Sequence, residues 1–156
     1  MATDREQFRL NYLVSGLPDD AIDQVAAMAE FNTVPGGKAI IQKGDKTADL
    51  FVILEGQVNV YADEGAKIAQ RGPGSVLGEI ALVDDNPRSA YAVALGNVRV
   101  AKLDGRALRR FMFQNRDIGF IMLANLSRVL SMRLRQATET IEDLQGSARD
   151  PWEWAT

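Results

Sequence analysis

The chain of 156 residues contains neither cysteine nor histidine. The lack of cysteine excludes disulfides, thiol chemistry and iron–sulfur clusters held by thiolates. Without histidine as well, a zinc site, a histidine-ligated haem and the commonest general base are unavailable. General acid–base catalysis by carboxylates would need a second acid placed opposite Glu79 with a substrate between them, and the sequence offers none. We therefore expect a protein that is not an enzyme and that holds no metal and no cofactor.

Long apolar runs are also missing, because no stretch approaches the roughly 18 apolar residues of a membrane span. The N-terminus, residues 1–6, lacks the features of a signal peptide. A hydrophobic content of 46% and a charged content of 25% are typical of a soluble globular protein, and the length suits one domain. We therefore expect a cytoplasmic protein without membrane contact. The net charge of −3 argues weakly against a nucleic-acid partner.

The pattern of apolar residues divides the chain into three parts. Residues 4–30 have helical periodicity with a break at residues 16–18, which predicts a helical cap. Residues 31–103 hold short apolar runs separated by glycine turns, which indicates antiparallel β structure. The runs are 31–34, 38–42, 49–54, 57–61, 67–71, 90–95 and 98–103. The prediction is an α+β fold built on a compact β-roll of about seven to eight strands.

The helical pattern returns after Asp104, which suits the N-cap of a helix over 106–114. A longer helix follows from about residue 117 to about residue 145. It carries a stripe of apolar or small residues at spacings of three and four, namely Leu123, Leu126, Leu130, Leu134, Ala137, Ile141 and Leu144. A helix of about 28 residues is about 42 Å long. Because it outruns a domain of this size, its far half is expected to pack on another copy in a homodimer.

The stretch from residue 78 to residue 90 places one acid and one base among apolar and turn-forming residues. Glycine followed by Glu-Ile-Ala-Leu predicts a short helix whose first N–H groups are unpaired and suit an anion. Pro87 disfavours helical geometry at the residue before it, so the chain should turn into an extended run. That run would bring Arg88 back over the helix start.

The side chains of this stretch suit two parts of one ligand. Arg88 offers a planar fork of donors that matches phosphate oxygens, and Ser89 adds a hydroxyl. Glu79 would repel phosphate, so its natural partners are sugar hydroxyls. The residues therefore predict a ribose-phosphate site, although a tight surface turn with an ordinary Glu and Arg remains the simpler alternative.

This stretch resembles the phosphate-binding cassette of cyclic-nucleotide-binding domains, which occur in protein kinase A regulatory subunits, cyclic-nucleotide-gated channels and the bacterial catabolite activator protein. The resemblance covers about residues 15–145 and includes Lys-Gly-Asp at 43–45 and Leu-Phe-Val-Ile-Leu-Glu-Gly at 50–56. It implies that Glu79 holds the ribose 2′-hydroxyl, that Arg88 holds the cyclic phosphate and that Ser89 assists. The same resemblance implies a close backbone approach at Gly78 and phosphate-facing amides at Ile80 and Ala81.

In the catabolite activator subfamily, the equivalent of the long helix forms the homodimer interface and closes over the base. The resemblance implies the same dual use here, with the helix 117–145 as the interface. Candidates to reach the base are Arg133, Arg135 and Thr138, each of which could instead be an exposed polar residue. The tail 146–156 holds both tryptophans. Trp152 could cover the purine, the tail could dock on a partner, or it could pack on its own domain.

The resemblance favours cAMP over cGMP, because serine follows the cassette arginine in cAMP-binding bacterial members and threonine there favours cGMP. Only eleven residues follow residue 145, too few for a helix-turn-helix, so we expect no DNA-binding domain after the domain 1–145. The predicted function is a stand-alone cyclic-nucleotide-binding regulatory protein that acts on an unknown effector protein. The alternative is a nucleotide-independent interaction module, against which the retained Glu79 and Arg88 argue.

Overall fold

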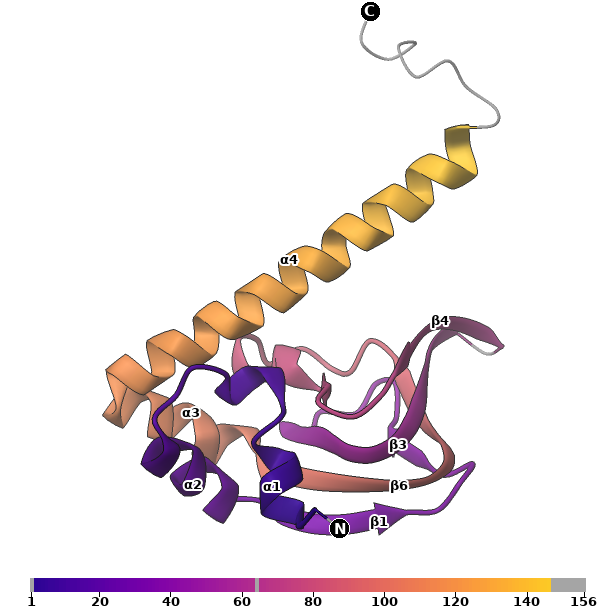
Figure 1. Cartoon of the computed structure of the whole chain (residues 1–156). Coiled ribbons are helices and arrows are strands. Elements are labelled where there is room, and N and C mark those ends of the chain that lie inside the picture. Colours follow the sequence, from indigo (N-terminus) through magenta and orange to yellow (C-terminus); the bar gives the residue numbers. More distant parts are fainter. Residues whose placement is uncertain (1, 64, 147–156) are drawn as a thin grey trace, which may run out of the picture.

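The computed structural model describes residues 2–63 and 65–146 (Figure 1). The N-terminal part forms three short helices, α1 (Asp4–Phe8), η1 (Tyr12–Val14) and α2 (Asp19–Ala27). Side chains cap the first two, because the Thr3 hydroxyl accepts from the Glu6 N–H and the Asn11 side chain accepts from the Leu13 N–H. The expected N-terminal helices are therefore present, with a break between η1 and α2, and the first strand begins at Glu30.

In the described residues, six strands form one antiparallel sheet. They are β1 (Glu30–Val34), β2 (Ala39–Ile41), β3 (Asp49–Asp63), β4 (Ala66–Arg71), β5 (Val76–Leu77) and β6 (Tyr91–Asp104). The main order is β1-β6-β3-β4, with β2 paired to β6 and β5 paired to β3. The predicted α+β fold with an antiparallel β-roll is confirmed.

Two expected strand breaks are wrong, because β3 runs through 49–63 and β6 through 91–104 without ending. The register between these strands shifts on either side of Glu55, and the second shift spans Gly56, which has a φ of +92°. A Cβ at Gly56 would lie 2.7 Å from the Asn97 carbonyl oxygen, so only glycine fits this close approach. Gly56 therefore forms a bulge within a bent strand pair, where the sequence suggested a turn.

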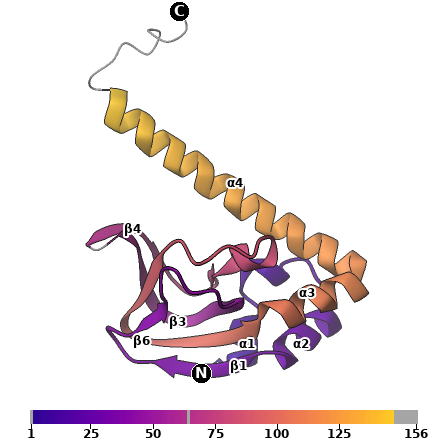
Figure 2. The same cartoon turned by 180° about the vertical axis from the view of Figure 1, so that it is seen from behind.

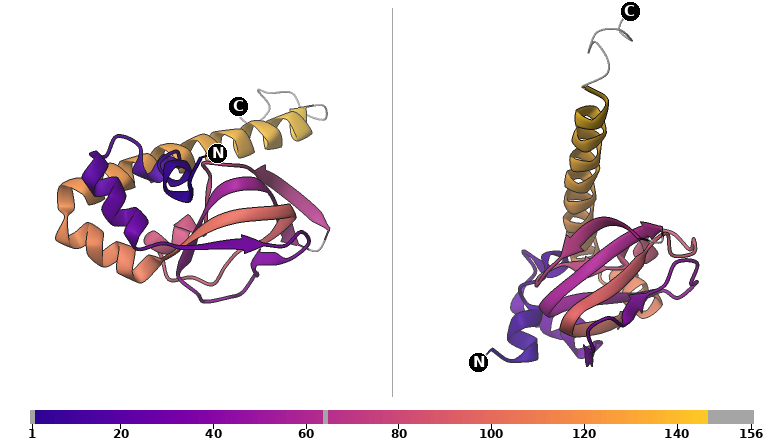
Figure 3. Two further views of the ribbon diagram at one scale, coloured as in Figure 1. Left: turned by 60° about the horizontal axis from the view of Figure 1, so that its bottom comes forward. Right: turned by 90° about the vertical axis from the view of Figure 1, so that its right-hand side faces the viewer.

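Two helices follow the sheet, α3 (Gly105–Gln114) and α4 (Arg116–Gly146). The Asp104 carboxylate accepts from the N–H groups of Arg106 and Ala107, as predicted for an N-cap. The far end of α4 extends well beyond the β-roll (Figures 2 and 3). None of the helices in the described part of the chain combines the length and the apolarity that crossing a membrane needs.

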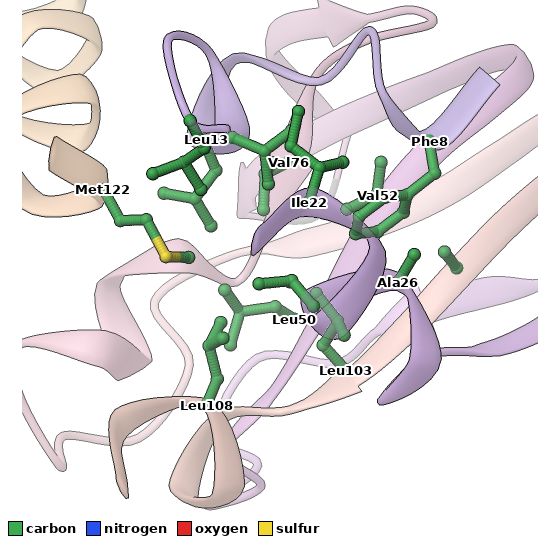
Figure 4. Close-up of a cluster of buried hydrophobic side chains, with 14 of the residues drawn as sticks. Phe8, Leu13, Ile22, Ala26, Leu50, Val52, Val76, Leu103, Leu108 and Met122 are labelled. Atoms are coloured by element: carbon green, nitrogen blue, oxygen red, sulfur yellow. The ribbon is translucent and has the colours of Figure 1, made fainter. Parts of the chain in front are cut away.

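The main hydrophobic core lies between the helices and one face of the sheet (Figure 4). Leu50 and Leu103 from the sheet pack in this core with Leu13 of η1, Leu108 of α3 and Met122 of α4. A second cluster of buried residues, which includes Ile53, Val58, Leu77, Ala92 and Val98, lies among the strands. The first core fixes the near part of α4, and Leu77 and Ala92 of the second also line the cavity described below.

A buried amide fastens α4 to the N-terminal helices. Asn125 is only 4% exposed, and its Nδ2 donates to the carbonyl oxygens of Leu13 at 3.0 Å and Ser15 at 2.8 Å. Its Oδ1 accepts from Arg128. Because these carbonyls belong to η1 and the residue after it, the near part of α4 and η1 hold one fixed relative position.

Candidate functional site

The predicted cassette begins with a sharp turn at Gly78, which has a φ of +76°. A Cβ there would lie 2.7 Å from the Asp49 carbonyl oxygen and from Arg88 Nη1, so the position requires glycine. The short helix expected after it is the single 3₁₀ turn η2 (Glu79–Leu82). The Ala81 N–H donates to the Gly78 carbonyl at 3.1 Å and is therefore occupied in this structure.

Arg88 lies over the start of η2, as its place after Pro87 predicted. Its Nη1 donates to the Gly78 carbonyl oxygen at 3.1 Å, and its Nη2 donates to the Asp49 carbonyl oxygen. Its own backbone is fixed by bonds to Gly44 and Asp45. Burial lowers the pKa of Arg88, and the nearby acids Asp49, Glu79 and Asp45 oppose this shift. The guanidinium is therefore held by neutral carbonyls and keeps its charge for an anion.

Glu79 is 7% exposed and forms an ion pair with an arginine of α4. Arg133 Nη1 donates to Glu79 Oε1 at 2.6 Å across 54 positions of sequence. This pair joins the cassette to the long helix. A second link comes from α3, where Arg109 Nη2 donates to the Ala81 carbonyl oxygen at 2.6 Å. Both C-terminal helices therefore contact η2 directly.

The cassette forms one side of a cavity of about 390 Å³. This volume lies within the roughly 300–1,000 Å³ usual for small-molecule sites. The sheet adds a largely apolar part of the lining, with Ile41, Val60, Ile68, Ala69 and Ala92 among its residues. The cavity thus combines charged groups with an apolar wall from the sheet.

The structure brings all of the predicted cassette residues to this cavity, namely Gly78, Glu79, Ile80, Ala81, Arg88 and Ser89. Of the candidates on α4, Arg133 lines it. Arg135 and Thr138 are exposed and are not among the lining residues, and the Thr138 hydroxyl donates to the Leu134 carbonyl of its own helix. Trp152 lies outside the described residues. Among the candidates on α4, Arg133 is therefore the one whose position allows contact with a ligand in the cavity.

Sequence reasoning missed two residues beside Glu79. Arg71, the last residue of β4, is half-buried and lines the cavity. Burial and the neighbouring Arg133 lower the pKa of Arg71, whereas Glu79 opposes the shift. Tyr12 of η1 has a buried hydroxyl without a hydrogen-bond partner in the described part of the chain. Burial, and then the charge of Glu79, raise the pKa of Tyr12. The sequence signal for Arg71 was a charged residue ending a strand beside Gly72-Pro73-Gly74.

Comparisons with known proteins agree on one family. The model of the cyclic nucleotide-binding domain matches residues 31–115. A CRP-like cAMP-activated global transcriptional regulator of Mycobacterium tuberculosis is 26% identical over 136 residues, which cover 85% of this chain and 59% of that protein. A cAMP-dependent protein kinase regulatory subunit of Eremothecium gossypii is 32% identical over 102 residues, covering 65% of this chain and 22% of that protein.

The fold agrees with the same group of proteins. The crystal structure of the Thermus thermophilus catabolite activator protein superposes with a TM-score of 0.72 at 27% identity, covering 86% of this chain and 63% of that one. The chain spans less than two thirds of the length of these relatives. The matched family is a ligand-binding domain, and the two sequence relatives are named as regulators.

Proposed function

Because the chain belongs to the cyclic nucleotide-binding domain family, we propose that it is a regulatory protein that binds cAMP in preference to cGMP and acts on a separate effector protein. One observation carries the proposal: Arg88, Ser89 and Glu79 line a single cavity. An interaction module that binds no nucleotide is the second candidate. The half-buried charge of Arg88, whose hydrogen bonds within the described residues go to two carbonyls, argues against it.

In the proposed complex, the cyclic phosphate lies against the Arg88 guanidinium and the Ser89 hydroxyl. The carbonyls of Gly78 and Asp49 orient the guanidinium before the ligand arrives, so little side-chain entropy is lost on binding. The Glu79 carboxylate accepts from the ribose hydroxyl. The base packs on the apolar wall that includes Val60 and Ile68. The preference for cAMP rests on Ser89 and on the family resemblance.

The contact between Glu79 and Arg133 gives the ligand a way to act at a distance. In the present structure, Arg133 already occupies Glu79 Oε1. A ribose hydroxyl that donates to the same carboxylate changes the partners of Arg133, which is part of α4. The position of the far half of α4 would then depend on the bound state, because the ligand stabilises one arrangement over the other.

The proposed form of the protein is a homodimer through α4. Leu134 is 69% exposed, Ile141 is 54% exposed and Leu144 is 75% exposed, and these side chains continue the apolar stripe of the helix. A second copy would bury them in a self-complementary interface. If the bound ligand changes the angle at which the two copies of α4 cross, the dimer would present a different surface to the effector.

Isothermal titration of the purified protein with cAMP and cGMP tests the proposal. We expect heat with both ligands and tighter binding of cAMP. Arg88→Ala should weaken binding by about 1.5–3 kcal/mol, some ten- to hundredfold, because a charge-assisted phosphate contact is lost. Glu79→Ala should act similarly through the ribose.

Arg106→Ala is the matched control, because this arginine is exposed on α3 and is not among the residues that line the cavity. Thermal melts should show that every variant remains folded. The absence of heat with either ligand at millimolar concentration would favour the interaction module. Parent-like binding by both cassette variants would show that the cassette assignment is wrong.

A further inference from the structure

The hydroxyl group of Tyr12 in η1 is a buried polar group that the proposed function does not use. It has no hydrogen-bond partner within residues 2–63 and 65–146. Burying a donor away from water without an acceptor is costly, and most buried polar groups in native proteins are hydrogen-bonded. An acceptor that becomes available when the protein binds its ligand would remove this cost.

The backbone around Tyr12 is held on two sides. The Tyr12 N–H donates to the Gly74 carbonyl oxygen at 3.2 Å, in the connection between β4 and β5. The carbonyl oxygen of the next residue, Leu13, accepts from Asn125 of α4 at 3.0 Å. Tyr12 is therefore fixed by contacts that involve neither the cassette nor the far half of α4.

The Tyr12 hydroxyl lies at the end of the cavity that the proposed function assigns to ribose. The charges of Glu79, Arg133 and Arg71 all act on it. Of these three groups only the Glu79 carboxylate is an acceptor, and in the present structure Arg133 donates to its Oε1 at 2.6 Å. Burial and the charge of Glu79 raise the pKa of Tyr12, so its hydroxyl keeps the proton and remains a donor.

A bound ribose gives Glu79 a need for such a donor. Glu79 is only 7% exposed, and a buried carboxylate that loses its arginine partner is strongly destabilised. In the proposed function, a ribose hydroxyl competes with Arg133 for this carboxylate. A neutral hydroxyl is a weaker donor than a guanidinium, so it offsets only part of the loss. A second donor, held by the protein close to Glu79, would offset more of it.

We propose that Tyr12 is a positioning residue for ribose: when the nucleotide binds, its hydroxyl donates to the Glu79 carboxylate and holds it toward the 2′-hydroxyl. This inference rests on the proposed function, because it takes the contact between Glu79 and ribose from it. Tyr12 is not among the residues that line the cavity, so it acts on the ligand through Glu79. Tyr12 thereby favours a ribonucleotide over its 2′-deoxy form.

The test is titration of the full chain with cAMP and with 2′-deoxyadenosine 3′,5′-cyclic monophosphate, which lacks the 2′-hydroxyl. Tyr12→Phe keeps the ring and removes the donor. It should weaken cAMP about tenfold, because a hydrogen bond to a charged acceptor is lost, and weaken the deoxy nucleotide less than about twofold. Tyr61→Phe is the matched control, because Tyr61 is half-buried in β3 and is not among the lining residues. It should change neither ligand.

The variant Glu79→Ala shows whether Tyr12 acts through the carboxylate. In that background Tyr12→Phe should weaken cAMP by less than about twofold, because residues that act through one contact are not additive. A tenfold effect that persists there would overturn the inference. Equal weakening of both nucleotides by Tyr12→Phe in the parent background would also overturn it, as would unchanged binding of cAMP.

Thermal melts without ligand separate positioning from a structural role. Because the hydroxyl has no partner in the described residues, Tyr12→Phe should melt at no lower a temperature than the parent. A clearly lower melting temperature would contradict the inference. If the parent binds neither nucleotide, the proposed function fails, and the role of Tyr12 fails with it. If the parent binds cAMP and Tyr12→Phe binds it equally well, the inference alone fails.

Discussion

The two halves of α4 share one apolar pattern but differ in what surrounds them. In residues 116–130, Met122 and Leu126 are buried in the main core, and Asn125 is bonded to two carbonyls near η1. In residues 131–146, the apolar side chains are mostly exposed. Among the described residues, the far half contacts another element by hydrogen bond or ion pair only through Arg133 and Glu79.

This difference shows that tertiary packing of α4 ends close to Arg133, where the helix reaches the cavity. The near half is fixed by burial and, within the described residues, contributes nothing to the cavity lining. The far half is held by one ion pair that involves the carboxylate proposed to bind ribose. A small ligand could not shift a helix buried along its whole length, whereas it can compete for a single polar contact.

The largest expected effect is on the free energy of unfolding, which a substitution in the near half of α4 should lower more than one in the far half. Leu126→Ala removes a side chain that is 2% exposed and should lower the free energy of unfolding by about 3 kcal/mol. Leu134→Ala, at a position 69% exposed, should lower it by less than about 0.5 kcal/mol. Urea unfolding at submicromolar protein measures both values. Equal losses at that dilution would contradict the division of α4.

The next effect concerns assembly through the far half. In a homodimer, Leu134 and Ile141 would be buried at the seam, and a glutamate at each position should weaken association by at least about 2 kcal/mol per copy. Light scattering should give twice the 17.1 kDa chain mass for the parent and the single mass for Leu134→Glu with Ile141→Glu.

Gln136→Glu adds a similar charge outside the seam and should stay dimeric, as should a chain ending at Gln145. A parent mass near 17.1 kDa with and without nucleotide would refute the dimer. The apolar stripe would then serve packing within one chain only.

The smallest effect concerns the ion pair itself. Arg133→Ala should increase amide hydrogen exchange in residues 131–140 of the unliganded protein about fivefold, because a partly buried ion pair contributes about 1 kcal/mol. Exchange in residues 118–128 should not change. Arg135→Ala, at an exposed position outside the cavity lining, is the control. Faster exchange in both halves would mean that the pair stabilises the whole helix.

The sequence predicted features that depend on neighbours along the chain. The turn at Gly78, the return of Arg88 after Pro87 and the Asp104 cap all arise within a few residues, and all appear in the structure. The bounds of α4 also agree within one residue. Local turn and capping chemistry was sufficient for these predictions.

Features set by distant segments could not be predicted in the same way. Gly56 with positive φ suits a turn and a bulge equally well, and only the approach of Asn97 decides between them. Arg133 and Arg135 lie about 200° apart around a helix, so choosing between them required the rotation of α4 against the cavity. Arg71 at the end of β4 and Tyr12 in η1 both lie close enough to Glu79 to interact with its charge. No sequence pattern within one of these elements indicates that the three residues lie close together.

The two hydrogen bonds from Asn125 to the carbonyls of Leu13 and Ser15 fix one point of α4, so that a tilt of the helix would turn about this point. The far end at Gly146 lies about 32 Å beyond that point along the helix axis. A tilt of 10° about Asn125 would therefore move that end by about 6 Å. Arg133 lies between Asn125 and the end of the helix at Gly146. A displacement of about 2 Å at Arg133 would therefore become more than twice as large at Gly146.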